Sequence, residues 1–345
     1  MKNIGYKIIL LFICIAVLCL ATYSVAFADT VSPHFETSAK SAVVMERSSG
    51  RILFSKNEDA RLPIASTTKI VTALTVLKNC DLNAVVEIPA EACGIEGSSI
   101  YLRSGEHLTV KELLYGLMLR SGNDAATALA LHVGGSVERF ADMMNNLAAE
   151  LGLQNCHFAN PHGLHDDQHY CSANDLAVLT REALNNKDFC EIVSTKTVRI
   201  SNEGYEYDRV LVNKNKLLSN YDCADGVKTG YTKKAGRCFV GSATRNEMQV
   251  IVVVLNCGPM FEETAAMLNE AFEKYTLKTV VPLNKQCGSI EDNGVKRYFI
   301  CPERIQYPLT DKEVAATQVV LDKEIRIIRV FVNKVVVREI ELQEM

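Results

Sequence analysis

The chain of 345 residues has no tryptophan, no internal repeat and no low-complexity tract. These absences exclude solenoid folds and long disordered tails. It also lacks a run of basic residues, which argues against nucleic acid or an anionic lipid surface as its partner. Although twelve cysteines occur, none form a C-x-x-C pair. Their spacing therefore does not indicate a disulfide framework.

What the chain does contain is typical of a soluble globular protein. Hydrophobic residues make up 48% of the sequence and charged residues 23%, enough to bury a sizeable core. The length fits about two domains.

The first 28 residues differ from the rest. Lys2 and Lys7 precede a long apolar run, and Ala26 and Ala28 then form an A-x-A pattern before Asp29. This order is typical of a signal peptide, and the apolar run is short for a membrane span. We expect residues 1–28 to be removed on export; an uncleaved N-terminal anchor is the alternative. Removal takes away two lysines and no acidic residue, so the mature chain is more acidic.

Ten cysteines lie beyond this segment. An even number in an exported protein favours disulfides. Several lie in apolar runs, such as Cys238 in "RCFVGSA" and Cys257 in "VVVLNC", where a thiol packs as a small hydrophobic group. We expect mostly free thiols.

Hydrophobic periodicity predicts an α+β protein. A β-hairpin is expected at 41–57. A helix is predicted at 261–275, after the strands named below. The other predicted helices are 66–79, 109–133, 136–152 and 172–186, the last capped by Ser172, and the predicted strands are 225–232, 237–245 and 248–257. From about residue 279 only short β-type runs remain. The prediction is a first domain at 29–277, with helices flanking an antiparallel sheet, and a small C-terminal β-sandwich domain at 278–345.

The stretch "PIASTTKI" places Lys69 three residues after Ser66. On a helix that begins at Ser66, these two side chains share one face, with their Cβ atoms about 5–6 Å apart. A lysine there can accept the serine proton if burial or nearby cations lower its pKa. The alternative is an ordinary helix start, in which Ser66 caps and Lys69 is solvated.

Two downstream motifs favour the reactive serine. Ser121–Gly122–Asn123 interrupts a helical run, and Lys228–Thr229–Gly230 opens a predicted strand. S-x-x-K, S-x-N and K-T-G in this order form the signature of penicillin-recognising serine enzymes. Ser172–Ala173–Asn174 also fits S-x-N, but Ser172 is explained as a helix cap. We therefore select Ser121 and Asn123.

With these motifs the chain resembles the low-molecular-mass penicillin-binding proteins, the serine-type D-alanyl-D-alanine carboxypeptidases. The stretches "PIASTTKIVTAL", "LLYGLMLRSGNDAATALA", "FANPHGLHDDQHYCSANDLA" and "DGVKTGYT" carry the resemblance, which covers most of residues 40–275. It implies the fold of serine β-lactamases and transpeptidases. It also implies removal of the terminal D-alanine from peptidoglycan stem pentapeptides, inhibition by β-lactams, and no cofactor or metal.

The resemblance also implies a role for each motif residue. Ser66 is the acylated nucleophile, Lys69 its base, and Ser121 a proton relay to the leaving amine. Asn123 holds the substrate backbone, while Lys228 and Thr229 recognise the terminal carboxylate. Gly230 lets the substrate lie close to the strand edge, and the backbone N–H groups of Ser66 and Tyr231 form the oxyanion hole.

The sequence departs from the family pattern at two points. Relatives often carry an arginine before the helix that corresponds to 261–275, whereas this loop is "NCGPMFEE", which puts substrate affinity in question. Many relatives also end in an amphipathic membrane helix. This sequence ends in the strand-like "VVVREIELQEM", so we expect no C-terminal membrane helix.

Four alternatives stay open at this stage. His162, His165 and His169, together with Asp166 and Asp167, could hold a metal, although no C-x-x-C or H-E-x-x-H frame accompanies them. A β-lactamase would use the same acylation, but "REALN" has Arg181 where class A enzymes carry the deacylating Glu. A D,D-endopeptidase and a non-catalytic wall-binding protein are the other two.

Overall fold

The computed structural model describes residues 35–292, 295–322 and 325–344. The predicted signal peptide, residues 1–28, lies outside the described residues.

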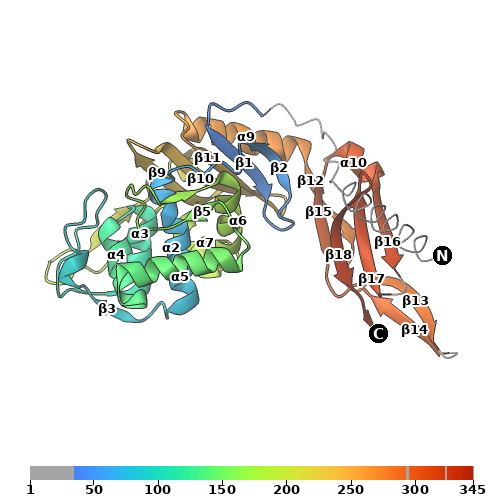
Figure 1. Ribbon diagram of the computed structural model, residues 1–345, viewed down its shortest axis with the longest axis horizontal. Helices are drawn as coiled ribbons and strands as arrows, with labels where there is room; N and C mark the ends of the chain where they lie inside the picture. Colours follow the sequence, from blue (N-terminus) through green and yellow to red (C-terminus); the bar gives the residue numbers. More distant parts are fainter. Residues whose placement is uncertain (1–34, 293–294, 323–324, 345) are drawn as a thin grey trace, which may run out of the picture. The chain divides into compact units, whose positions relative to one another are not determined.

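A five-stranded antiparallel sheet forms the centre of the N-terminal part, with the strand order β2-β1-β11-β10-β9 (Figure 1). Its strands are β1 (Ser41–Glu46), β2 (Ile52–Lys56), β9 (Ala224–Thr232), β10 (Gly236–Arg245) and β11 (Met248–Leu255). The predicted hairpin at 41–57 and the three later strands are confirmed. Strand β9 lies at an edge of the sheet, so one side of its backbone is free of strand partners.

Both faces of this sheet are buried, which explains why its central strand is a continuous apolar run. In β11, Val250, Val252 and Val254 pack on one side, and Ile251 and Val253 on the other. Helix α9 (Met260–Lys274) covers the first face, and α6 (Ala173–Ala183) and α7 (Lys187–Ser194) pack against the second (Figure 1). The prediction of helices flanking an antiparallel sheet is thus confirmed.

The other helices of this part cluster on the face that α6 and α7 cover. They are η1 (Ala65–Thr68), α2 (Lys69–Asn79), η2 (Ala90–Ala92), α3 (Val110–Leu119), α4 (Asn123–Gly134) and α5 (Val137–Glu150), while α8 (Leu217–Asn220) precedes β9. Three short strand pairs complete the N-terminal part. They are β3 (Val85–Glu87) with β4 (His107–Thr109), β5 (Cys156–His157) with β6 (Tyr170–Cys171), and β7 (Thr197–Ile200) with β8 (Arg209–Val212).

Two predicted helix boundaries are wrong. The helix expected from Ser66 begins at Lys69, because residues 65–68 form the tighter 3₁₀ turn η1, in which Ser66 makes no cap hydrogen bond. The helix expected at 109–133 is two helices, since α3 ends at Leu119 and α4 begins at Asn123. Ser121 breaks it by adopting a left-handed backbone with φ of 63°. The predicted cap of α6 is confirmed: Ser172 Oγ accepts the N–H of Asp175 at 3.0 Å.

The C-terminal part is built mainly of short strands around a small apolar cluster that includes Val281, Ile305, Ile328 and Val330. Its elements are β12 (Thr276–Val281), β13 (Gln286–Asp292), β14 (Val295–Ile300), β15 (Ile305–Leu309), α10 (Asp311–Ala315), β16 (Thr317–Asp322), β17 (Ile327–Val332), β18 (Val335–Glu341) and β19 (Gln343–Glu344). The all-β expectation missed α10, whose first turn Thr310 and Glu313 stabilise as a capping box.

Across the residues that the structure describes, no helix combines the length and apolar composition needed to cross a membrane.

Candidate active site

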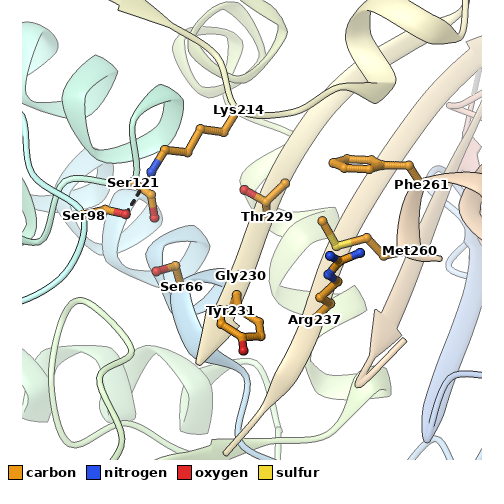
Figure 2. A pocket seen from close by; sticks show the side chains of 10 residues that line it. All are labelled: Ser66, Ser98, Ser121, Lys214, Thr229, Gly230, Tyr231, Arg237, Met260 and Phe261. Carbon is orange, nitrogen blue, oxygen red and sulfur yellow. Dashed lines mark hydrogen bonds between the residues drawn. The ribbon is translucent and has the colours of Figure 1, made fainter. Parts of the chain in front are cut away.

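A cleft of about 490 Å³ lies where η1 meets the edge strand β9 (Figure 2). Five of the eight predicted site residues line it, namely Ser66, Ser121, Thr229, Gly230 and Tyr231. The other three, Lys69, Asn123 and Lys228, are at most 3% exposed. The structure therefore separates the predicted set into residues that open to the cleft and residues that are buried.

Lys69 is the buried centre of the site. Its Nζ lies 3.1 Å from Ser66 Oγ, 2.7 Å from Asn123 Oδ1 and 2.7 Å from the carbonyl oxygen of His162. The turn η1 brings this about, because Ser66 belongs to the turn while Lys69 is the first residue of α2. The predicted serine–lysine pair is thus in hydrogen-bond contact.

The surroundings of Lys69 disfavour its charged form. Burial lowers its pKa well below the usual value, and the positive charges of Lys228 and Lys214 lower it further, against a smaller opposing effect of Asp124. No carboxylate is among its three hydrogen-bond partners. This environment favours the neutral amine, which is the form that can accept a proton.

Lys228 is a second buried amine, 1% exposed, whose Nζ donates to the carbonyl oxygen of Thr229 at 2.9 Å. Burial, followed by the charge of Lys214, lowers its pKa to about 7. Lys228 therefore exchanges its proton in the physiological range.

Asn123 contacts Lys69 through its side-chain amide. Its Oδ1 accepts from Lys69 and its Nδ2 donates to the carbonyl oxygen of Glu96 at 2.5 Å. Both ends of the amide therefore make hydrogen bonds within the protein, and the expectation that Asn123 holds the substrate backbone stays a prediction. The side chain orients the amine of Lys69.

Gly230 marks the closest approach of β9 to the nucleophile turn. A Cβ at this position would lie 3.0 Å from the backbone nitrogen atoms of Ser66 and Thr67 and from the carbonyl oxygen of Ile64. The absence of a side chain lets the strand edge and the N–H of Ser66 face the same space. Gly230 therefore allows β9 to pack directly against the turn η1.

Three polar residues of the cleft were missed by the sequence analysis. Lys214 Nζ donates to Ser98 Oγ at 2.9 Å, and Arg237 Nη1 donates to the carbonyl oxygen of Gly258 at 3.1 Å. Arg237 lies on β10 opposite Tyr231 and beside Met260 in the cleft (Figure 2). It thus reaches the loop that lacks the expected arginine. No motif marks these residues, since Lys214 is 148 positions beyond Ser66.

The segment 157–170 packs against η1, which contains Ser66, and against the first turn of α2. Thr72 Oγ1 donates to the carbonyl oxygen of Pro161 at 2.6 Å, and Thr68 Oγ1 lies 2.7 Å from His169 Nε2. Together with the contact of His162 to Lys69, the segment meets α2 and the end of η1 at three positions. It is a supporting element of the site rather than a surface loop.

The same contacts account for the histidines that raised the metal alternative. His169 Nδ1 accepts the N–H of Ala159, and His162 Nδ1 accepts that of Leu164. Within the described ranges, no group of three or more His, Cys, Asp and Glu side chains is arranged to hold a metal ion. These histidines serve the local structure of the segment.

We expect acid to destabilise the protein through His169. Burial lowers its pKa to about 4, against the opposing charge of Asp166. An unfolded chain protonates this imidazole below pH 6.5, whereas the folded chain does so only near pH 4. The free energy of unfolding should therefore fall by up to ~3 kcal/mol between these values, an effect absent above pH 7.

Urea unfolding of wild type and His169→Gln between pH 4 and 8 checks this. The variant loses the bond to Thr68, so it should be less stable at pH 8, but its stability should fall less on acidification. Parallel pH profiles for the two proteins would contradict the assignment, because His162, whose pKa burial lowers to about 3, remains in both.

Comparison with known proteins places this site in a family. Residues 27–258 match the family model described as D-alanyl-D-alanine carboxypeptidase. The carboxypeptidase DacF of Bacillus subtilis is 38% identical over 270 residues, covering 76% of this chain and 69% of the relative. DacA of Escherichia coli is 33% identical over 290 residues, covering 77% and 70%.

Solved structures agree. A D-alanyl-D-alanine carboxypeptidase of Mycobacterium tuberculosis, 30% identical, superposes with a TM-score of 0.66 over 69% of this chain and 92% of the other. Penicillin binding protein 5 of Haemophilus influenzae superposes with a TM-score of 0.79 over 90% and 97%; at 24% identity this likeness concerns the fold alone. These findings confirm the fold class and the resemblance noted in the motifs: the chain belongs to the D-alanyl-D-alanine carboxypeptidase family.

Proposed function

We propose that this protein is a serine-type D-alanyl-D-alanine carboxypeptidase that removes the terminal D-alanine from peptidoglycan stem pentapeptides through an acyl-enzyme on Ser66. β-Lactams inhibit it by acylating the same oxygen. The observation that carries the proposal is the contact between Lys69 Nζ and Ser66 Oγ at 3.1 Å, at the base of a cleft beside an edge strand.

Lys69 acts as the base because its three contacts leave one role for its lone pair. A neutral amine has two N–H bonds, which Asn123 Oδ1 and the carbonyl oxygen of His162 accept. The lone pair then faces Ser66 Oγ. Lys69 takes the hydroxyl proton as Oγ forms a bond to the carbonyl carbon of the penultimate D-alanine.

The oxyanion that forms is stabilised by the backbone N–H groups of Ser66 and Tyr231, each such donor being worth about 3–4 kcal/mol. The substrate lies along the free edge of β9 as an added strand. Ser121 relays the proton that Lys69 took from Ser66 to the leaving amine as the C–N bond breaks, and the buried amine of Lys228, whose pKa is lowered to about 7, supplies positive charge to the site. Water then hydrolyses the ester to release the tetrapeptide.

The terminal carboxylate of the substrate is held at the end of the cleft away from Ser121. Thr229 supplies a hydroxyl donor and Arg237 supplies positive charge there, whereas the amine of Lys214 lies beside Ser98 and Ser121 (Figure 2). Arg237 donates to the carbonyl oxygen of Gly258 in the loop before α9, which has no arginine of its own, and a guanidinium suits a carboxylate. The proposal therefore assigns carboxylate recognition to Arg237.

The place of action follows from the substrate. Peptidoglycan lies outside the cytoplasmic membrane, so we propose export by the signal peptide 1–28 and action at the cell wall, in its maturation and the control of cross-linking. The proposed domains are the peptidase at 29–277 and the β-sandwich at 278–345. Their boundary falls within β12, directly after α9.

The test is incubation of the protein with a stem pentapeptide that ends in D-Ala-D-Ala, with released D-alanine measured over time. A matched peptide with a C-terminal carboxamide is the control. It should be cleaved roughly 10–100-fold less efficiently in kcat/KM, because it cannot form the charged contact to Arg237.

A labelled penicillin separates the alternatives. The proposal predicts a stable adduct on Ser66. Rapid turnover of the penicillin without D-alanine release would instead indicate a β-lactamase, and cleavage of cross-linked dimers alone an endopeptidase. Absence of any adduct would indicate a binding protein.

A further inference from the structure

Two cysteines bracket the supporting segment 157–170. Cys156 lies in β5 and Cys171 in β6, and the two residues are direct Cα partners in this antiparallel pair. Among the strand pairs within the described residues, this is the one position at which two cysteines are in register. All ten described cysteines are free thiols in this structure.

The backbone hydrogen bonds define the geometry of the pair. The N–H of Cys171 donates to the carbonyl oxygen of Leu62 at 3.0 Å, and the N–H of Leu62 donates to that of Cys171. Both backbone polar groups of Cys171 therefore point away from Cys156. Ser172 N–H donates to the carbonyl oxygen of Asn155 at 2.9 Å, just outside the pair. Cys156 and Cys171 thus form a non-hydrogen-bonded pair, the closer of the two antiparallel types.

Such a pair suits a disulfide. Opposed residues of this type have Cα atoms about 4.5 Å apart and side chains on the same face, within the range that disulfides span. Burial raises the pKa of the Cys171 thiol, and hydrogen bonding with the Cys156 side chain raises it further. The register therefore places the two side chains where a disulfide can join them.

We propose that Cys156 and Cys171 form a redox pair. Oxidation to a cross-strand disulfide joins the two ends of the segment 157–170 and stabilises its contacts with η1 and α2. The segment between them contacts Thr68, Lys69 and Thr72. Closing its base restricts the unfolded chain and favours the conformation that holds Lys69. This pair is an exception to the expectation of mostly free thiols.

The oxidant is a disulfide, either a small molecule or another protein, and burial sets the order of events. Cys171 is fully buried and Cys156 only partly. The Cys156 thiolate attacks the oxidant, forming a mixed disulfide and releasing one thiolate. Cys171 then loses its proton to solvent and attacks the sulfur of Cys156, releasing the second thiolate. The protein gives up two electrons and two protons, and the oxidant becomes two thiols.

The first measurement uses wild-type protein treated with oxidised glutathione and then with an alkylating reagent. Digestion before aspartates separates the cysteines, since Cys156 lies in 142–165 and Cys171 in 167–174, each without another cysteine. We expect these peptides to be joined until a reductant is added. Recovery of both as alkylated thiols, or of Cys156 as a lasting glutathione adduct, would overturn the proposal.

The second measurement compares melting temperatures with and without reductant. Oxidised wild type should melt about 5 °C higher, as expected for closing a loop of about 15 residues. Cys156→Ser should lose this difference, whereas Cys80→Ser, which alters a half-buried thiol in another region, should keep it. If the two cysteines are joined but the melting temperature does not change, the proposed stabilisation by the disulfide is contradicted.

Discussion

Replacing Ser66 by alanine is expected to abolish both the penicillin adduct and the release of D-alanine. The change removes the oxygen that Lys69 Nζ contacts at 3.1 Å, and without it no acyl-enzyme forms. The loss should be at least roughly 10⁴-fold in kcat, as for other nucleophiles that act as a unit with a base. Intact-protein mass after penicillin treatment and a D-alanine assay measure it.

The variant should remain folded. Ser66 is partly exposed in the turn η1, and Lys69 keeps its bonds to Asn123 and His162. Its melting temperature should therefore stay close to that of wild type. Ser104→Ala, which changes an exposed serine outside the cleft, is the matched control and should retain both the adduct and the activity. Equal D-alanine release by Ser66→Ala, or an adduct on another serine, would refute the mechanism.

Gly163→Ala should produce the second large effect, through structure rather than chemistry. A Cβ at Gly163 would lie 2.0 Å from the carbonyl oxygen of Ala65 and 2.8 Å from Thr68 Oγ1, and the residue has φ of 85°. The conflicting oxygen belongs to the backbone just before the nucleophile, so no side-chain rotation relieves it. We expect a loss of roughly 4 kcal/mol or more in the free energy of unfolding.

Gly152→Ala separates the clash from the backbone strain. Gly152 has a similar φ of 73°, but a Cβ there meets nothing within 4 Å. This control should lose only about 1–2 kcal/mol. Penicillin acylation should fall about 100-fold in Gly163→Ala alone, because the segment that carries His162 moves away from Lys69. Urea unfolding and acylation rates measure both effects; equal losses in the two variants would show that the packing against Ala65 is unimportant.

The main elements of the fold could be predicted from the pattern of residues. The strand β11 was recognisable because both faces of the sheet are buried and its run of valines is continuous. Helix α6 was recognisable from its Ser172 cap. The boundaries near the site were not, because residues 65–68 adopt the tighter turn and Ser121 the left-handed backbone under tertiary constraint. Local propensity favours neither.

The sequence by itself determined the family and predicted the chemistry. The order of the three motifs selected Ser66, Lys69, Ser121 and Lys228 as candidates, since each motif combines residue types that acyl transfer requires. Only the tertiary structure decided what surrounds them. It assigned Asn123 to Lys69, brought Lys214 and Arg237 to the cleft, and set Cys156 opposite Cys171. These relations join residues far apart in the chain, and strand register and burial, which sequence spacing does not encode, create them.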